Sequence, residues 1–160
     1  MALSDDEFEA LVQQLQQNSF ADARDAYGEK GFDRWRNPLY HEPIANPDGS
    51  SFLQGSCGDS IGISLKFTGN RVERAAYQSN GCASSALCGS FTAELAIGRT
   101  PAELLKLTAS DVLEAIGHFP REDRHCATLA VKALQQAVKQ YQSNRSRQSH
   151  ETNRLPQSDQ

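Results

Sequence analysis

Three of the four cysteines in this chain could bind a metal together, because other potential ligands lie beside two of them. Asp59 follows Cys57 by two residues, and His125 directly precedes Cys126, while Cys82 lies between them in the sequence. Thiolates bind zinc, copper(I) and iron-sulfur clusters strongly, whereas imidazole and carboxylate form weaker, more exchangeable bonds. The residue types therefore predict a soft-metal or iron-sulfur site formed by Cys57, Asp59, Cys82, His125 and Cys126.

The length and charge of the chain limit the number of domains and the kinds of partner that we expect. Its 160 residues fit one domain with extensions, and its formal net charge is -4. Since no run of basic residues is present, we expect neither nucleic acid nor a membrane as a partner. The N-terminus is acidic and no stretch reaches the roughly 18 apolar residues that span a bilayer. We therefore expect a cytoplasmic protein, in which reduced cysteines favour metal binding over disulfides.

Helices are predicted at both ends of the chain. Ser4 and Glu7 have the spacing of a capping box, and the apolar residues that follow predict an N-terminal helix of roughly three to four turns. A second helical segment should end at Asn37, because the residue before Pro38 is disfavoured in helical conformation. The final helix is predicted from about residue 125 to 141, and residues 142–160 have too few apolar side chains to order themselves.

The middle of the chain changes from a period of two to helical spacing. Apolar residues alternate over 61–67 and more weakly over 72–78, with a turn at Gly69 and Asn70, which predicts a β-hairpin. Residues 51–54 could add a third strand. Helices are predicted over about 82–97, after Thr100 at a second capping box, and over about 110–116.

Each of the three cysteines falls at the boundary of a predicted element. Cys82 and Cys126 begin helices, where the oriented backbone amides lower the pKa of a thiol. Gly58 and Gly81, beside two of the cysteines, would let backbone amides approach cluster sulfurs. The alternative is that the cysteines are buried packing residues, since free cysteine is among the most buried residue types.

Spacing alone does not decide between metal sites, because the chain has no C-x-x-C pair. The sequence nevertheless resembles the IscU/NifU-type iron-sulfur cluster assembly scaffolds from about Tyr27 to Tyr141. The resemblance is carried by three motifs in order: Cys57-Gly58-Asp59, Gly81-Cys82-Ala83-Ser84-Ser85 and His125-Cys126. It implies an α+β, SufE/NifU-like fold with a small antiparallel sheet of about three strands and helices packed on one face. The implied organisation is an N-terminal helical extension over 1–26, a scaffold domain over 27–141 and a disordered polar tail over 142–160.

The resemblance also implies a function, which is that of a scaffold and not an enzyme. Such proteins take sulfur from a cysteine desulfurase, combine it with iron as a labile [2Fe-2S] cluster, and transfer the cluster to apo-proteins. Cys57, Cys82 and Cys126 match the three scaffold cysteines, Asp59 the aspartate that keeps the cluster labile, and His125 the histidine near the metal. Cys126 is the candidate for first acceptance of sulfur.

Two features depart from the family pattern. An Hsp70-type chaperone is a weaker expectation as a partner, because residues 119–123 (Phe-Pro-Arg-Glu-Asp) replace the segment that such chaperones grip, with Asp123 in place of a lysine. Cys88 has no counterpart among the three scaffold cysteines and is either a buried packing residue or a reserve thiol.

Two other functions remain open. A zinc-dependent sulfurtransferase would hold Zn²⁺ with Cys57, Asp59, Cys82 and Cys126, but the chain lacks the insertion that such relatives carry between the second and third cysteines. A structural zinc-binding interaction module is less favoured, because closed structural sites rarely use a glycine-flanked loop and an aspartate.

Overall fold

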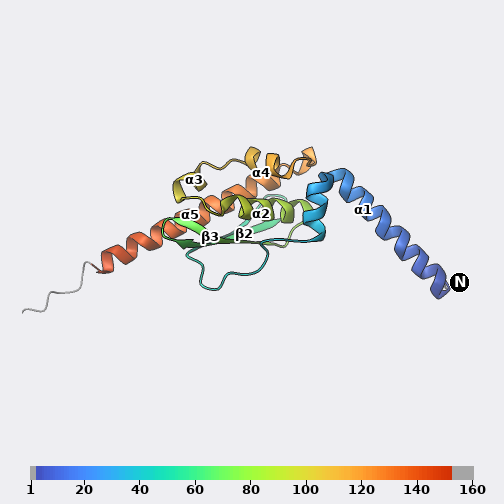
Figure 1. Ribbon diagram of the computed structural model, residues 1–160, viewed down its shortest axis with the longest axis horizontal. Helices are drawn as coiled ribbons and strands as arrows, with labels where there is room; N and C mark the ends of the chain where they lie inside the picture. The colour runs from blue at the N-terminus through green and yellow to red at the C-terminus, as the bar shows by residue number, and fades with distance from the viewer. Residues whose placement is uncertain (1–2, 153–160) are drawn as a thin grey trace, which may run out of the picture.

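The computed structural model describes residues 3–152 and has an α+β fold. Figure 1 shows helices layered over one face of a small sheet, with the N-terminal part of the first helix projecting from the body. The elements in chain order are α1 (Asp5–Arg36), β1 (Gly49–Gln54), β2 (Ser60–Thr68), β3 (Arg71–Ser79), α2 (Ala83–Ala96), α3 (Pro101–Leu105), α4 (Ala109–Ile116), the short 3-10 helix η1 (Arg121–Asp123) and α5 (His125–Thr152).

The sheet has three antiparallel strands in the order β1-β2-β3. The predicted hairpin is confirmed as β2 and β3, and the predicted third strand is β1, which pairs along β2. Ile61, Ile63 and Leu65 alternate along β2 and are completely buried, as their period of two indicates. They lie beneath α2 and α5, which pack against the sheet, and α3 and α4 cover those two helices in turn (Figure 1).

The helix α1 differs from the two separate helices expected at the N-terminus. The chain is helical from Asp5 to Arg36, but Gly28 has a φ of 67° and makes a kink that a residue with a side chain rarely adopts. The capping box of Ser4 and Glu7 is confirmed. Beyond the kink the helix packs on the body, and Phe20 and Tyr27 before the kink also make packing contacts. The N-terminal turns of the helix extend away from the body (Figure 1).

The end of α5 also differs from expectation. The helix continues to Thr152, where a disordered tail was expected from residue 142, and the remaining residues of that tail, 153–160, lie outside the described residues. A helix that is already nucleated gains one hydrogen bond for each added residue, so it can continue without burying apolar surface. Ser146 and Ser149 also donate hydrogen bonds to the carbonyls four residues before them. No helix within residues 3–152 has the length and apolar composition needed to cross a membrane.

Candidate metal centre

Three of the five expected ligands meet at one end of the sheet. Among residues 3–152, Asp59, Cys82 and Cys126 form a group whose ligand atoms all lie within 4.8 Å of one another. Asp59 directly precedes β2, Cys82 is the N-cap of α2, and Cys126 lies in the first turn of α5. Because α2 and α5 pack side by side on the sheet, their N-terminal ends bring together residues that are far apart in the sequence.

Gly81 makes room for the carboxylate of Asp59. A Cβ atom at position 81 would lie 2.7 Å from Cγ of Asp59 and 2.8 Å from its Oδ1, so any other residue there would displace the carboxylate. The nearest neighbour of Gly81 is therefore the carboxylate of Asp59, and the approach of its backbone amide to cluster sulfurs stays a prediction. Gly58 has open space around it and is required by its φ of 90° in the loop between β1 and β2.

Cys57 lies outside the group of three. It is exposed on the loop between β1 and β2, which is closed by hydrogen bonds from the amide of Gly55 to the carbonyl of Asp59 (2.8 Å) and from the amide of Gly58 to the carbonyl of Gly55 (3.1 Å). A cysteine on such a short exposed loop can change its position without disturbing the core.

His125 lies beside the group, and its Nε2 faces Cys126. Its Nδ1 is 3.0 Å from the carbonyl oxygen of Glu122, which can only accept, so Nδ1 carries the proton. Its Nε2 then has a lone pair, and it lies 3.7 Å from Sγ of Cys126. A neutral imidazole in this tautomer can bind a metal through Nε2.

Burial reverses the expected acidity of one thiol. Cys126 is 1% exposed, and this burial raises the pKa of its thiol to about 11, although it lies at a helix N-terminus. Asp59 shows the opposite shift, because hydrogen bonds from Ser85 and then from Cys82 hold the pKa of its carboxyl below the ordinary value. Cys88 is completely buried in the core, which raises its thiol pKa far above the usual range and fits a packing residue.

Ser85 is a central residue of the site to which the sequence reasoning assigned no role. Its Oγ lies 2.7 Å from Oδ2 of Asp59, 3.4 Å from Sγ of Cys126 and 3.7 Å from Sγ of Cys82. The sequence contained a signal, since Ser85 follows Cys82 by three residues, and residues at that spacing share one face of a helix.

The neighbouring Ser84 belongs to a second network. Its hydroxyl donates to Oδ2 of Asp123 at 2.6 Å, and its Oγ lies 2.9 Å from the hydroxyl of Tyr27. Because the one proton of Ser84 is directed to the carboxylate, Tyr27 is the donor in the second contact. This chain of hydrogen bonds joins α1, α2 and η1.

A cavity of about 300 Å³ adjoins the site on the side of Cys82. It lies between the end of α1 and the start of α2, and its lining includes Trp35, Tyr77, Leu87 and Arg34. The Arg34 side chain is already paired with Glu94 at 3.0 Å. The cavity therefore offers a mainly apolar surface beside an exposed thiol.

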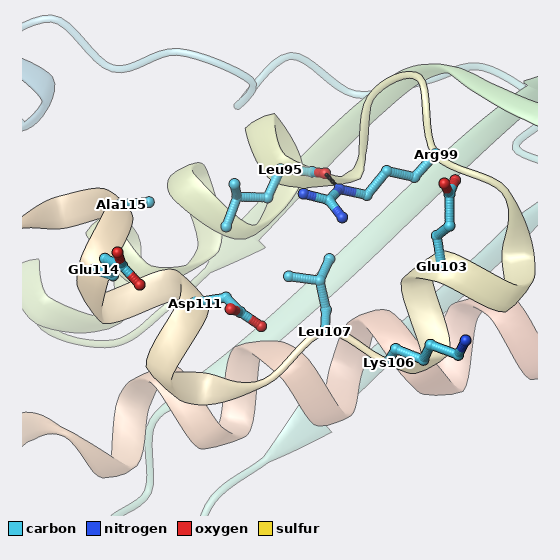
Figure 2. A pocket seen from close by; sticks show the side chains of 8 residues that line it. All are labelled: Leu95, Arg99, Glu103, Lys106, Leu107, Asp111, Glu114 and Ala115. Atoms are coloured by element: carbon cyan, nitrogen blue, oxygen red, sulfur yellow. Dashed lines mark hydrogen bonds between the residues drawn. The ribbon is translucent and has the colours of Figure 1, made fainter.

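A second hollow, shown in Figure 2, contains none of the predicted ligands. Two of its carboxylates cap helices, since Glu103 accepts from the amide of Thr100 and Asp111 accepts from the amide of Thr108 in capping boxes. The Nε of Arg99 donates to the carbonyl of Leu95 at 2.6 Å. Among the described residues, the grouped metal ligands therefore lie at the site of Cys82 and Cys126 and not in this hollow.

Comparison with known proteins identifies the family of this chain. Residues 26–148 match the model of the NifU-like N terminal domain family. The chain belongs to this family. It is 37% identical over 116 residues to the iron-sulfur cluster assembly scaffold protein IscU 1 of Archaeoglobus fulgidus, an alignment that covers 72% of this chain and 76% of the relative. The identity to the IscU scaffold protein of Aquifex aeolicus is 27% over 118 residues, covering 72% and 75%.

Membership of the NifU-like family also confirms the fold. The crystal structure of the N-terminal part of a nitrogen-fixing NifU-like protein from Brucella abortus superposes with a TM-score of 0.59, covering 75% of this chain and 96% of that one, at 21% identity. This likeness shows that the three-stranded sheet and its helices are the family fold, as the sequence predicted.

Proposed function

We propose that this protein is an iron-sulfur cluster assembly scaffold. The observation that carries the proposal is the meeting of Asp59, Cys82 and Cys126 within 4.8 Å in a chain of the NifU-like family. Two thiols and a carboxylate suit iron in a cluster, and the carboxylate bond exchanges more readily than a third thiolate bond. The role is that of a scaffold and not of an enzyme, because the bound cluster is cargo that leaves with a recipient protein.

Cys57 and His125 complete the ligand set in this proposal. Cys57 moves with its exposed loop toward the other two thiols when iron and sulfur are present. His125 offers Nε2 as an exchangeable ligand, since its Nδ1 is held by the carbonyl of Glu122. The cluster is a transient [2Fe-2S] unit, and zinc can occupy the same thiols when iron is absent.

Cys126 accepts the sulfur. Its thiolate attacks the outer sulfur of a persulfide on the cysteine desulfurase, so that one sulfur–sulfur bond breaks as another forms and the desulfurase thiolate leaves. Two electrons from a separate electron donor then reduce this sulfur to sulfide. Because Cys126 is buried here, its acceptance of sulfur requires a local rearrangement that exposes its thiol.

The partners are a cysteine desulfurase and apo iron-sulfur proteins, and residues 27–141 form the scaffold domain that contacts them. Residues 1–26 act as an extension outside that domain. A dedicated Hsp70-type chaperone is not part of the proposal, because Phe119 is buried, its ring packs against Tyr27, and Asp123 is bonded to Ser84.

Anaerobic reconstitution tests the proposal. The protein is mixed with Fe²⁺, cysteine and a cysteine desulfurase, and cluster formation is followed by visible absorption and circular dichroism. We expect cluster bands that are lost in Cys57→Ala, Cys82→Ala and Cys126→Ala and that move to an added apo-ferredoxin. Cys88→Ala is the matched control, since it removes a thiol that lies in the core.

The same experiment separates the zinc alternatives. A wild-type protein that forms no cluster, binds zinc tightly and accelerates the desulfurase would replace the scaffold proposal with zinc-dependent sulfur transfer. Tight zinc binding with no effect on the desulfurase would indicate a structural zinc module.

A further inference from the structure

Ser85 lies at the centre of the proposed metal ligands without being one of them. It is completely buried in the first turn of α2, and its hydroxyl contacts all three members of the group. The shortest of these contacts is the 2.7 Å hydrogen bond to Oδ2 of Asp59. A buried hydroxyl at such a distance from a carboxylate is a charge-assisted hydrogen bond, which is stronger than a neutral one.

The hydroxyl can donate only one proton, and this restricts what it can do. At any one time the proton of Ser85 points toward Asp59, Cys126 or Cys82, and the 2.7 Å contact with the carboxylate, which only accepts, is the shortest of the three. The thiol of Cys82 also donates to Oδ2 of Asp59, at 3.3 Å, but that proton is lost when Cys82 binds a metal as thiolate. Ser85 then remains as the hydrogen-bond donor that orients the carboxylate.

We infer that Ser85 is the positioning residue of this metal site, holding the carboxylate of Asp59 in the orientation in which it faces Cys82 and Cys126. The inference rests on the proposed function, since it assumes that these residues bind metal. Ligating carboxylates are commonly fixed by a hydrogen bond from outside the ligand set, and loss of such a bond typically weakens metal binding by about 10- to 100-fold.

Ser84 provides a matched control from the same turn of helix. It is also completely buried, but its hydroxyl contacts Tyr27 and Asp123 instead of the ligands. Ser84→Ala and Ser85→Ala therefore remove the same atoms at the same depth, and they differ in whether the lost hydrogen bond reaches a ligand.

The test is a double-mutant cycle on Co²⁺ affinity, measured anaerobically through the visible d–d bands and competition with a chelator. We expect Ser85→Ala to weaken Co²⁺ binding by at least about 10-fold and to shift the d–d bands, in line with the loss of a ligand-orienting bond. In an Asp59→Ala background the same change should alter affinity by less than about twofold, because its target is gone. Ser84→Ala should leave affinity and bands near those of wild type, and Ser85→Thr should restore binding to within about threefold by keeping the hydroxyl.

Several outcomes would overturn the inference. Equal effects of Ser85→Ala with and without Asp59, or an effect of Ser84→Ala as large as that of Ser85→Ala, would show that Ser85 does not act through the carboxylate. A Thr variant as weak as the Ala variant would show that the hydroxyl is not what matters. Circular dichroism and thermal melting of each variant identify those that fold. If wild-type protein binds no metal and forms no cluster, the proposed function itself fails, and this result is distinct from an additive cycle in a wild-type protein that binds Co²⁺.

Discussion

The two ends of α1 both carry apolar side chains at helical spacing, but those side chains differ in burial. Before the kink at Gly28 the side chains of Phe8 and Leu15 are 58% and 57% exposed, whereas beyond it Phe32 is 1% exposed. Phe32 packs against Phe20 and Trp35, with ring centroids 5.9 and 6.1 Å away. Apolar spacing therefore predicts a helix, whereas the tertiary fold determines whether the apolar face of that helix packs against other side chains.

The site shows the same contrast between packed and projecting parts. Cys126 is buried at the start of α5, and Cys57 is exposed on a loop outside the group of three. Both were predicted ligands. Their surroundings, which the sequence did not reveal, predict that the two thiols react at different rates in the metal-free protein.

The largest expected effect comes from truncating an aromatic ring on the packed part of α1. Phe32→Ala should lower the free energy of unfolding by about 3–5 kcal/mol, because it leaves a cavity among packed aromatic side chains. Phe8→Ala, the matched change before the kink, should alter it by no more than about 0.5 kcal/mol. Urea unfolding monitored by circular dichroism measures both. Similar losses at the two positions would show that the N-terminal part of α1 is also packed in solution.

Thiol labelling sharpens the contrast within the site. At pH 8, iodoacetamide should modify Cys57 and Cys82 more than about 10-fold faster than Cys126, because the thiolate is the nucleophile and burial raises the pKa of Cys126 to about 11. The rate at Cys126 should rise as the pH approaches 11, since the thiolate fraction increases with pH. Mass spectrometry of peptides from samples quenched over time gives the rates. Equal rates at pH 8 would contradict the buried position of Cys126.

A smaller effect is expected where α1 is tied to the body. Tyr27→Phe removes the hydroxyl that contacts Ser84 and should lower the free energy of unfolding by about 1 kcal/mol, the typical value of one hydrogen bond. Urea unfolding measures this loss, and Tyr40→Phe, whose hydroxyl has no hydrogen-bond partner among the described residues, is the control. Equal free energies of unfolding for the two variants would show that the hydroxyl of Tyr27 does not stabilise the protein through Ser84.

The smallest effect is expected from removing the projecting part of α1. Deletion of residues 1–17 keeps Phe20 and its contacts, and it should change the free energy of unfolding by no more than about 0.5 kcal/mol. Co²⁺ affinity should stay within about twofold, because no ligand lies in the deleted segment. Calorimetry of metal binding and urea unfolding test both statements. A large decrease in Co²⁺ affinity or in the free energy of unfolding would show that residues 1–17 contact the rest of the protein.

Much of the secondary structure could be predicted from the sequence, because its signals act over a few residues. The capping boxes at Ser4 and Thr100 are each closed by a residue three positions later. The alternation along β2 marks its buried face directly. The three cysteines and Asp59 were identified by residue type and by resemblance, and the structure brings Cys82 and Cys126 together with Asp59.

Sequence patterns alone predicted most of the elements, the capping boxes at Ser4 and Thr100, and the residues with the chemistry to bind a metal, but they did not predict the continuity of α1 or the extension of α5 to Thr152. Only the tertiary structure decided that Cys126 is buried, that Cys57 stays apart, that Gly81 gives space to Asp59, and that Ser85 lies among the ligands. The physical reason is that periodicity and capping depend on neighbours along the chain. Burial, hydrogen bonding to Ser85 and ligand distances depend on how α2 and α5 meet at the end of the sheet.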